Sequence, residues 1–327
     1  MPWPLRRRSK LSALLVVTLT FVTAASPPSG AQSAEARKKE QTTLYANAKP
    51  YMDDPPGQLQ KALRELKGLD PARNQDQLPE MLRKVAARAD ALLRATPDLI
   101  SDESVSEAQW TVDKGIVPGC TGGGCVDPAR TAEREQKFNY IILAHRTANN
   151  QLHVEEYRTT DNNKPVEGAG APYFQGFVAS WLIFSSPNQV ESRFRYLGQQ
   201  KMNGQATFII AFAQIPGAVE MPGTIMTNRG SIPMLLQGVA WVDQSDFRIV
   251  RMHTDLLAPQ LAMGYEEQTS DIIFGPVHIS AADLELWLPQ TVNAEMEAQG
   301  QKLEERHRYS KYRLFQAKSR IVAAPSN

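Results

Sequence analysis

The sequence has few of the residues that most often carry catalytic or metal chemistry. It contains 2 cysteines and 5 histidines in 327 residues. No two histidines form an H-E-x-x-H pair, whereas a zinc site needs about four ligands. The G-x-S-x-G elbow of hydrolases and the G-x-x-x-x-G-K-[ST] phosphate loop are also missing. These absences predict a protein that is not an enzyme, with no metal and no cofactor.

A basic excess is missing too. The chain has 36 Lys and Arg against 35 Asp and Glu. Removing residues 1–31 takes away four of the basic residues and none of the acidic ones, which leaves a formal charge of −3. Nucleic-acid binding depends on a surplus of positive charge. Nucleic acid is therefore not expected as a partner.

Long apolar runs are confined to the N-terminal end. Arg6, Arg7, Arg8 and Lys10 precede an apolar run from Leu11 to Ala25, and small residues follow. This is the layout of a secretory signal peptide, predicted over residues 1–31. The alternative is an uncleaved anchor, although a membrane span needs about 20 apolar residues. We expect a periplasmic or secreted protein with no stable membrane span after cleavage.

The two cysteines lie close together in PGCTGGGC, as Cys120 and Cys125. An exported protein meets an oxidising compartment, which favours a disulfide between them. Free thiols remain an alternative. Metal or redox chemistry is a further one, although no other ligand is near in sequence and the C-x-x-C spacing is absent.

The periodicity of apolar residues divides the remainder of the chain. Residues 32–57 are polar and predict a flexible leader, and residues 321–327 predict a tail. Residues 58–97 predict two helices, the second with Pro79 in its first turn and an apolar stripe on one face. We expect this helical segment to pack on a sheet formed by residues 98–320.

Alternation of apolar and polar residues predicts the strands, as in residues 292–299. Turn signals at Asn149-Asn150, Asn203-Gly204 and Gln244-Ser245 separate paired runs and predict antiparallel hairpins. About nine or ten strands result. The predicted fold class is α+β, with a large curved antiparallel sheet (a half-barrel) and two N-terminal helices.

Two segments do not fit this meander. Residues 159–173 predict a loop. Residues 216–237 combine Gly and Pro with several large apolar side chains. A long loop with so much apolar surface must bury it, so we expect a flap that folds back over the sheet.

Large aromatic residues fall within the predicted strands. One interpretation is an ordinary core. The sharper one is that some of them line an apolar ligand cavity. The candidates for ligand binding are Tyr196, Phe208, Phe212, Trp241 and Trp287.

The stretch GVAWVDQSDFRIVRM (residues 238–252), followed by DIIFGPVHI, LWLPQTV and RHRYSKYRLF, resembles a group of uncharacterised secreted proteins common in Acidobacteria. Residues 78–105 resemble the amino-terminal segment of that group. More distantly, the layout is similar to the outer-membrane lipoprotein-sorting carriers (Lol-type half-barrels) and their stress-sensing relatives. In this resemblance Trp241 and Asp243 occupy the central hairpin, where Asp243 helps to start the turn.

The resemblance implies an exported binding protein whose half-barrel cavity holds an apolar ligand, either an acyl chain or a lipoprotein segment. The expected partner is then a lipid or a lipoprotein. The alternative is an envelope sensory or scaffolding domain that acts through contacts with another envelope protein. A hydrolase is the remaining alternative, without a motif to support it.

Overall fold

The computed structural model describes residues 34–111, 130–146, 152–166, 171–174, 176–227 and 230–315. The predicted signal peptide, the two cysteines, the Asn149-Asn150 turn and the tail lie outside these residues. None of the helices within the described ranges combines the length and the apolar character needed to cross a membrane.

The described chain is mostly antiparallel sheet, with three α-helices. The helices are α1 (Ala34–Leu44), α2 (Pro56–Ala62) and α3 (Leu78–Ala95). Eleven strands form one sheet in the order β1-β5-β6-β9-β10-β11-β12-β13-β2-β3-β4. These strands are β1 (Asp70–Pro71), β2 (Leu99–Thr111), β3 (Arg130–Arg146), β4 (Leu152–Thr159), β5 (Ser192–Met202), β6 (Gln205–Gln214), β9 (Leu236–Asp243), β10 (Ile249–Leu256), β11 (Tyr265–Ile279), β12 (Leu284–Ala298) and β13 (Gln301–Leu314).

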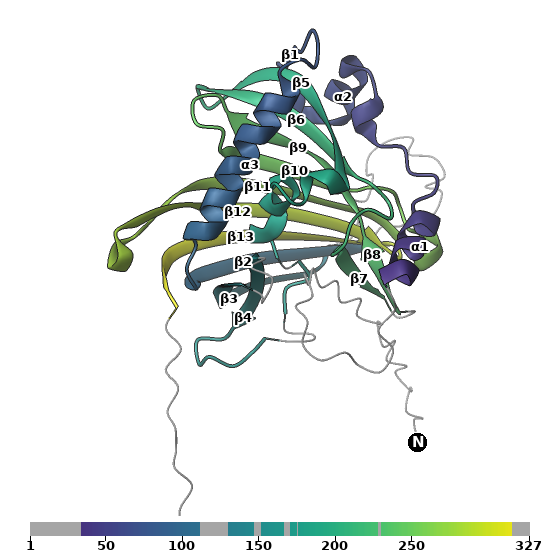
Figure 1. Cartoon of the computed structure of the whole chain (residues 1–327). Helices are drawn as coiled ribbons and strands as arrows, with labels where there is room; N and C mark the ends of the chain where they lie inside the picture. The colour runs from purple at the N-terminus through teal and green to yellow at the C-terminus, as the bar shows by residue number, and fades with distance from the viewer. Residues whose placement is uncertain are drawn as a thin grey trace, which may run out of the picture.

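The predicted α+β class and the large antiparallel sheet are confirmed. The sheet bends around α3 (Figure 1). It ends at β1 and β4, which pair with β5 and β3 and, within the described residues, not with each other. The sheet is therefore open, with eleven strands where nine or ten were predicted.

Consecutive hairpins build most of the sheet, as the turn signals predicted. Asn203 and Gly204 join β5 to β6 with φ angles of 51° and 85°. Two successive residues with positive φ match the type I′ turn that Asn-Gly favours. Gln299 and Gly300 join β12 to β13 in the same way, with φ angles of 51° and 73°.

Both faces of the sheet are covered, which agrees with residues 206–213 (ATFIIAFA) being apolar on both faces of their strand. Along β6, Ile210 and Phe212 join one buried cluster, and Ile209 and Ala211 join another. The first cluster includes side chains of α3, and we call that side the inner face. The second includes Leu59 of α2, and we call that side the outer face. The two predicted helices thus pack on opposite faces.

The segment predicted as a flexible leader is ordered in the structure from residue 34. Helix α1 and the 3₁₀ helix η1 (Tyr51–Asp53) lie within it. Tyr45 and Met52 are buried in the outer-face cluster, and the Tyr45 hydroxyl donates to the Pro233 carbonyl oxygen at 3.1 Å. A few large side chains thus anchor this stretch against the outer face, although its composition as a whole is polar.

Strand β2 was not predicted from the sequence. It lies between β13 and β3 and extends the sheet to β4. Its inner-face positions include Ser101, Glu103 and Glu107, all of them buried. Because polar residues occupy the buried face, the apolar alternation that normally indicates a strand is lost.

The segment 216–237 buries several of its large apolar residues, as expected, although Met221 is exposed. It contains the separate hairpin of β7 (Gly223–Thr227) and β8 (Gly230–Met234). Ile225 and Met234 join the inner-face cluster, whereas Val219 and Leu235 join the outer-face cluster. The segment therefore contributes to the cores on both faces.

Candidate functional site

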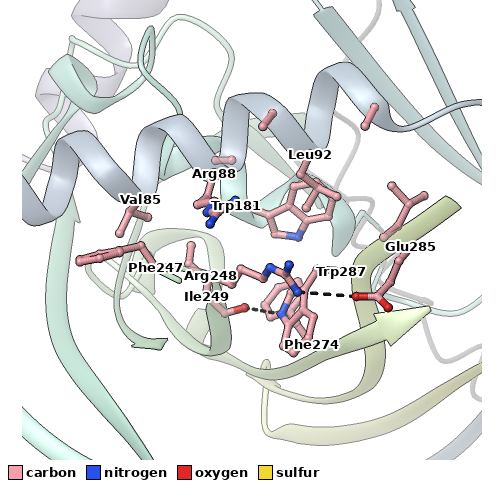
Figure 2. A pocket seen from close by; sticks show the side chains of 14 residues that line it. Val85, Arg88, Leu92, Trp181, Phe247, Arg248, Ile249, Phe274, Glu285 and Trp287 are labelled. Atoms are coloured by element: carbon pink, nitrogen blue, oxygen red, sulfur yellow. Dashed lines mark hydrogen bonds and ion pairs between the residues drawn. The ribbon is translucent and has the colours of Figure 1, made fainter. Parts of the chain in front are cut away.

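A cavity of about 200 Å³ lies between α3 and the inner face of the sheet (Figure 2). Helix α3 forms one wall, and β10, β11 and β12 form the opposite one. The 3₁₀ helix η4 (Val178–Phe184) closes one side with Trp181. The lining residues are Val85, Arg88, Ala89, Ala91, Leu92, Ala95, Trp181, Phe247, Arg248, Ile249, Phe274, Glu285, Leu286 and Trp287.

Short side chains on α3 account for the space. Ala89, Ala91 and Ala95 line the cavity from the helix. Val85, which also lines the cavity, and Leu93 are larger, and both are buried in the inner-face cluster, so they hold the helix against the sheet. A helix that is anchored by large residues and lined by alanines leaves a hollow between its anchors.

Aromatic rings form the deep walls of the cavity. The rings of Trp181 and Phe274 meet edge to face, with centroids 6.2 Å apart. The indole Nε1 of Trp287 donates to the Ile249 carbonyl oxygen at 2.9 Å. The Nε1 of Trp181 is buried and has no hydrogen-bond partner among the described residues. Its nitrogen edge is turned toward the cavity in Figure 2, so the donor without a partner is on the cavity side of the ring.

Charged side chains stand at the mouth. Arg88 donates from Nε to the Asp246 carbonyl oxygen at 2.7 Å. The guanidinium of Arg248 lies 3.1 Å from the Asp246 carboxylate and 3.9 Å from that of Glu285. It also lies over the Trp287 ring, 5.2 Å from its centroid. The apolar interior therefore opens between two arginines and one carboxylate.

Phe247 forms the lip of the cavity in an unusual backbone conformation. Its φ of 62° is in the left-handed region, which large side chains rarely adopt. Asp243 fixes the turn, because its carboxylate accepts hydrogen bonds from the Ser245 and Asp246 backbone N–H groups at 2.7 and 3.1 Å. The predicted role of Asp243 in starting this turn is confirmed. The Phe247 ring then stacks on Phe208 at 5.9 Å.

The structure places the candidate binding residues in different surroundings. Trp287 lines the cavity. Tyr196, Phe208 and Phe212 share the inner face with it but pack against other aromatic rings. Tyr196 meets Phe208 at 6.0 Å, and Phe212 meets Phe184 at 5.7 Å. These three side chains support the walls around the cavity and do not line it.

Trp241 lies on the outer face, within the cluster that the N-terminal segment covers. Its Nε1 donates to Gln200 Oε1 at 2.8 Å, and the Arg251 guanidinium lies over its ring at 4.7 Å. The wall of the sheet thus separates Trp241 from the cavity.

Trp181, Phe247 and Arg88 were not among the candidate residues. Trp181 belongs to the apolar run VASWLIF (residues 178–184), which lies between two loops and carries no strand or helix period. Phe247 is a large aromatic residue in a turn, where polar residues are usual. That mismatch was the available signal in the sequence.

A second group of residues on the inner face forms a buried ionic cluster, consisting of Glu103, Arg158, Glu305 and His307. Arg158 donates from two nitrogens to the two carboxylate oxygens of Glu103, at 2.5 and 2.7 Å. Nδ1 of His307 lies 2.9 Å from Glu103 Oε1. Nε2 of His307 is 3.2 Å from Glu305 Oε2, without the alignment of a hydrogen bond. All four side chains are almost inaccessible to solvent.

The pKa values in this cluster favour the charged forms. Burial raises the pKa of Glu103, but the charge of Arg158 and the hydrogen bonds from His307 and Arg158 outweigh it and lower the pKa to about 2. Burial lowers the pKa of His307, yet its contacts with Glu103 and Glu305 raise it above its ordinary value. The cluster is therefore an ionised network that compensates its own burial.

Glu305 connects this cluster to the cavity. Its two carboxylate oxygens accept the backbone N–H groups of Tyr173 and Phe174, at 2.8 and 3.1 Å. A few residues further on, the ring of Phe177 packs edge-on against His307, with centroids 5.0 Å apart. The same segment continues into η4 and Trp181. We call residues 171–184 the strap; residue 175 within it lies outside the described residues.

The remaining predictions concern histidine and cysteine. In the register of β3 and β4, His145 is the partner of His153. Within the described residues, no group of three His, Cys, Asp or Glu side chains could hold a metal ion. Cys120 and Cys125 lie outside those residues, so the disulfide stays a prediction.

Known proteins resemble this chain in structure only. No family model matches it, and no curated protein matches its sequence. A DUF1329 family protein from Desulfovibrio piger is 12% identical, with a TM-score of 0.37 over 75% of this chain and 95% of that one. A LolA superfamily protein from Nitrosomonas europaea is 11% identical, with a TM-score of 0.32 over 72% and 94%. The lipoprotein LppX from Mycobacterium tuberculosis is 13% identical, with a TM-score of 0.23 over 72% and 95%.

Structures similar to this chain thus include a member of the superfamily whose layout the sequence resembles. The likeness concerns the arrangement of the strands and helices. The function proposed next rests on the side chains of this chain.

Proposed function

We propose that the protein binds an amphiphilic molecule and holds its apolar part in the cavity between α3 and the sheet. The observation that carries this proposal is the hollow itself, which has alanines on one wall and Trp181, Phe274 and Trp287 on the others. Ligand sites are typically apolar hollows with a few polar groups at defined places. An acyl chain or an apolar lipoprotein segment has this chemistry.

Binding without catalysis fits the side chains present. Glu285 is the one carboxylate among the lining residues, and it lies at the mouth, 3.9 Å from Arg248. Among the residues that the structure describes, no histidine, cysteine or serine lines the cavity. An acid–base or nucleophilic mechanism needs such groups beside the substrate.

The volume sets the scale of the affinity. A cavity of about 200 Å³ has room for about seven groups of water size, at about 30 Å³ each. Burying about seven methylene groups contributes about 5 kcal/mol, at about 0.8 kcal/mol each, before the cost of ordering the chain. A single short chain should therefore bind in the range of about 0.1 to 1 mM. A longer chain would require α3 or the strap to move.

We further propose that binding takes place in the periplasm or outside the cell. The layout of residues 1–31, with basic residues before a short apolar run, supports export. The ligand would then be a lipid or a lipoprotein of the cell envelope.

The test uses 1-octanol as an uncharged probe and the fluorescence of Trp181 and Trp287 as the signal. Ala91→Phe should fill the mouth and weaken binding at least tenfold. Ala87→Phe is the matched control, because Ala87 and Ala91 are both exposed on α3 but Ala87 does not line the cavity. Mass spectrometry of lipids extracted from natively purified protein provides a second readout.

Two outcomes would contradict the proposal. If wild-type protein binds no 1-octanol and carries no lipid after purification, the cavity does not bind an amphiphile. Equal binding by Ala91→Phe and the control would place the probe elsewhere. One stoichiometric envelope protein, purified with the chain in the absence of lipid, would instead favour the sensory or scaffolding function.

A further inference from the structure

The polar groups at the cavity are nearly all hydrogen-bond donors. Arg88 and Arg248 line its mouth, and the unpaired N–H of Trp181 is turned toward it. An arginine has only donors, and so has an indole N–H. Glu285 is the one acceptor side chain with a charge, and it lies on the Arg248 side. A ligand that satisfies this set must offer acceptor oxygens.

The positive charge of Arg88 is uncompensated within the described chain. Arg88 donates a hydrogen bond from Nε to the backbone carbonyl oxygen of Asp246, and this leaves both terminal nitrogens of the guanidinium free to donate. Arg248, in contrast, has carboxylates of Asp246 and Glu285 at 3.1 and 3.9 Å. The mouth thus holds one arginine, Arg88, that has no carboxylate partner among the described residues and lies at the edge of an apolar hollow.

We infer that the ligand is an anionic amphiphile, whose carboxylate or phosphate is bound at the mouth by Arg88 while its chain fills the hollow. This inference rests on the proposed function of the cavity and deepens it. The planar fork of an arginine presents two parallel N–H groups that match two oxygens of either anion. Arg248, although paired with two carboxylates, adds further donors, and the Trp181 N–H is a donor on the wall of the cavity.

The experiment compares probes with the same eight-carbon chain. Octanoate and octyl phosphate test the two anions, 1-octanol is the neutral reference, and octylamine reverses the charge. We expect wild-type protein to bind at least one anion about fivefold to tenfold more tightly than 1-octanol, because a charge-assisted hydrogen bond forms as the chain enters. Octylamine should bind more weakly than 1-octanol. The stronger of the two anions identifies the head group.

Variants locate the effect. Arg88→Gln should abolish the preference for the anion over 1-octanol. Arg94→Gln removes the same charge from the exposed side of the same helix, away from the cavity, and should leave the preference intact. Trp181→Phe keeps an aromatic wall but removes the N–H, so it should lower the ratio of anion binding to 1-octanol binding a few-fold, with Trp287 as the remaining fluorescent group at the cavity.

The possible failures are separate. If 1-octanol binds as tightly as both anions, the anionic head group is wrong and the apolar site stands. If Arg88→Gln and Arg94→Gln reduce the preference equally, the effect is the general field of the helix and the assignment to Arg88 is wrong. If no eight-carbon probe binds, the proposed function itself fails.

Discussion

Replacing Glu103 with glutamine should strongly destabilise the protein. The side chain is 1% exposed, and the change removes one charge of a buried pair and leaves Arg158 in place. A carboxyl pKa lowered from 4.5 to about 2 corresponds to about 3 kcal/mol, at about 1.4 kcal/mol per pH unit. Loss of one partner of a buried ion pair typically costs about 3–5 kcal/mol. Both routes predict a loss of about 3 kcal/mol or more in the free energy of unfolding.

The matched control is the ion pair of Arg193 with Asp53. It has the same two-fold contact, at 2.9 and 2.5 Å, but its side chains are 53% and 48% exposed. Asp53→Asn should therefore cost less than about 1 kcal/mol. Urea unfolding followed by circular dichroism measures both. Similar losses of unfolding free energy in the two variants would refute the claim that burial makes the Glu103–Arg158 pair more stabilising than an exposed pair.

The same carboxyl predicts the behaviour at acid pH. Because its pKa is lower in the folded chain than in the unfolded one, its stabilisation is present above about pH 4.5 and is lost as the pH falls toward 2. In Glu103→Gln the fall in stability over this window should be smaller by about the same 3 kcal/mol. Parallel acid titrations of the two proteins would contradict this assignment.

Three further outcomes are expected. The pKa of His307 is raised in the folded chain, so its stabilisation of the fold is present below about pH 6.5 and is lost as the pH rises through the folded pKa. The free energy of unfolding should therefore fall between pH 6 and pH 9, and this fall should be smaller in His307→Asn. Gly238→Ala should cost more than about 2 kcal/mol in urea unfolding, because a Cβ there would lie 2.2 Å from the backbone oxygen of His253 on the facing strand; an unchanged midpoint would show that the strands separate easily. Glu305→Gln should accelerate hydrogen exchange of the Tyr173 amide at least about fivefold, because a neutral acceptor is weaker than a carboxylate, whereas unchanged protection would mean that other contacts hold the strap.

The sheet could be predicted wherever one face is apolar. Strand β12 alternates clearly, with Val292, Ala294 and Met296 buried, and its pairing with β13 follows from one tight turn. Strand β2 could not be predicted, because its buried face carries charged residues whose partners come from distant strands. Glu103 meets His307 at a separation of 204 residues, and no local pattern encodes that contact.

The site was harder to predict from the sequence than the fold. A strand pattern shows that Trp241 and Trp287 are each in the sheet, but not which face each one occupies when both faces are buried. Trp287 lines the cavity, and Trp241 lies against the N-terminal segment, for which the sequence predicts a flexible leader. The cavity itself is formed by segments that are far apart in the sequence. Ala91 of α3 lines it together with Trp181 of η4 and Phe247 of a turn, each more than 80 residues away from Ala91.

The inner face has two chemically different halves, and the strap crosses both. Around β10 to β12 the face is apolar and holds the cavity; around β13 and β2 to β4 it holds the buried ionic cluster. An ionic network has strict geometric demands, because each charge must keep its partners to remain buried. Glu305 therefore holds the start of the strap at a defined place. The position of Trp181, near the other end of the strap, depends on where that start is held. The polar half of the sheet thus fixes the aromatic wall of a cavity to which it contributes no side chain.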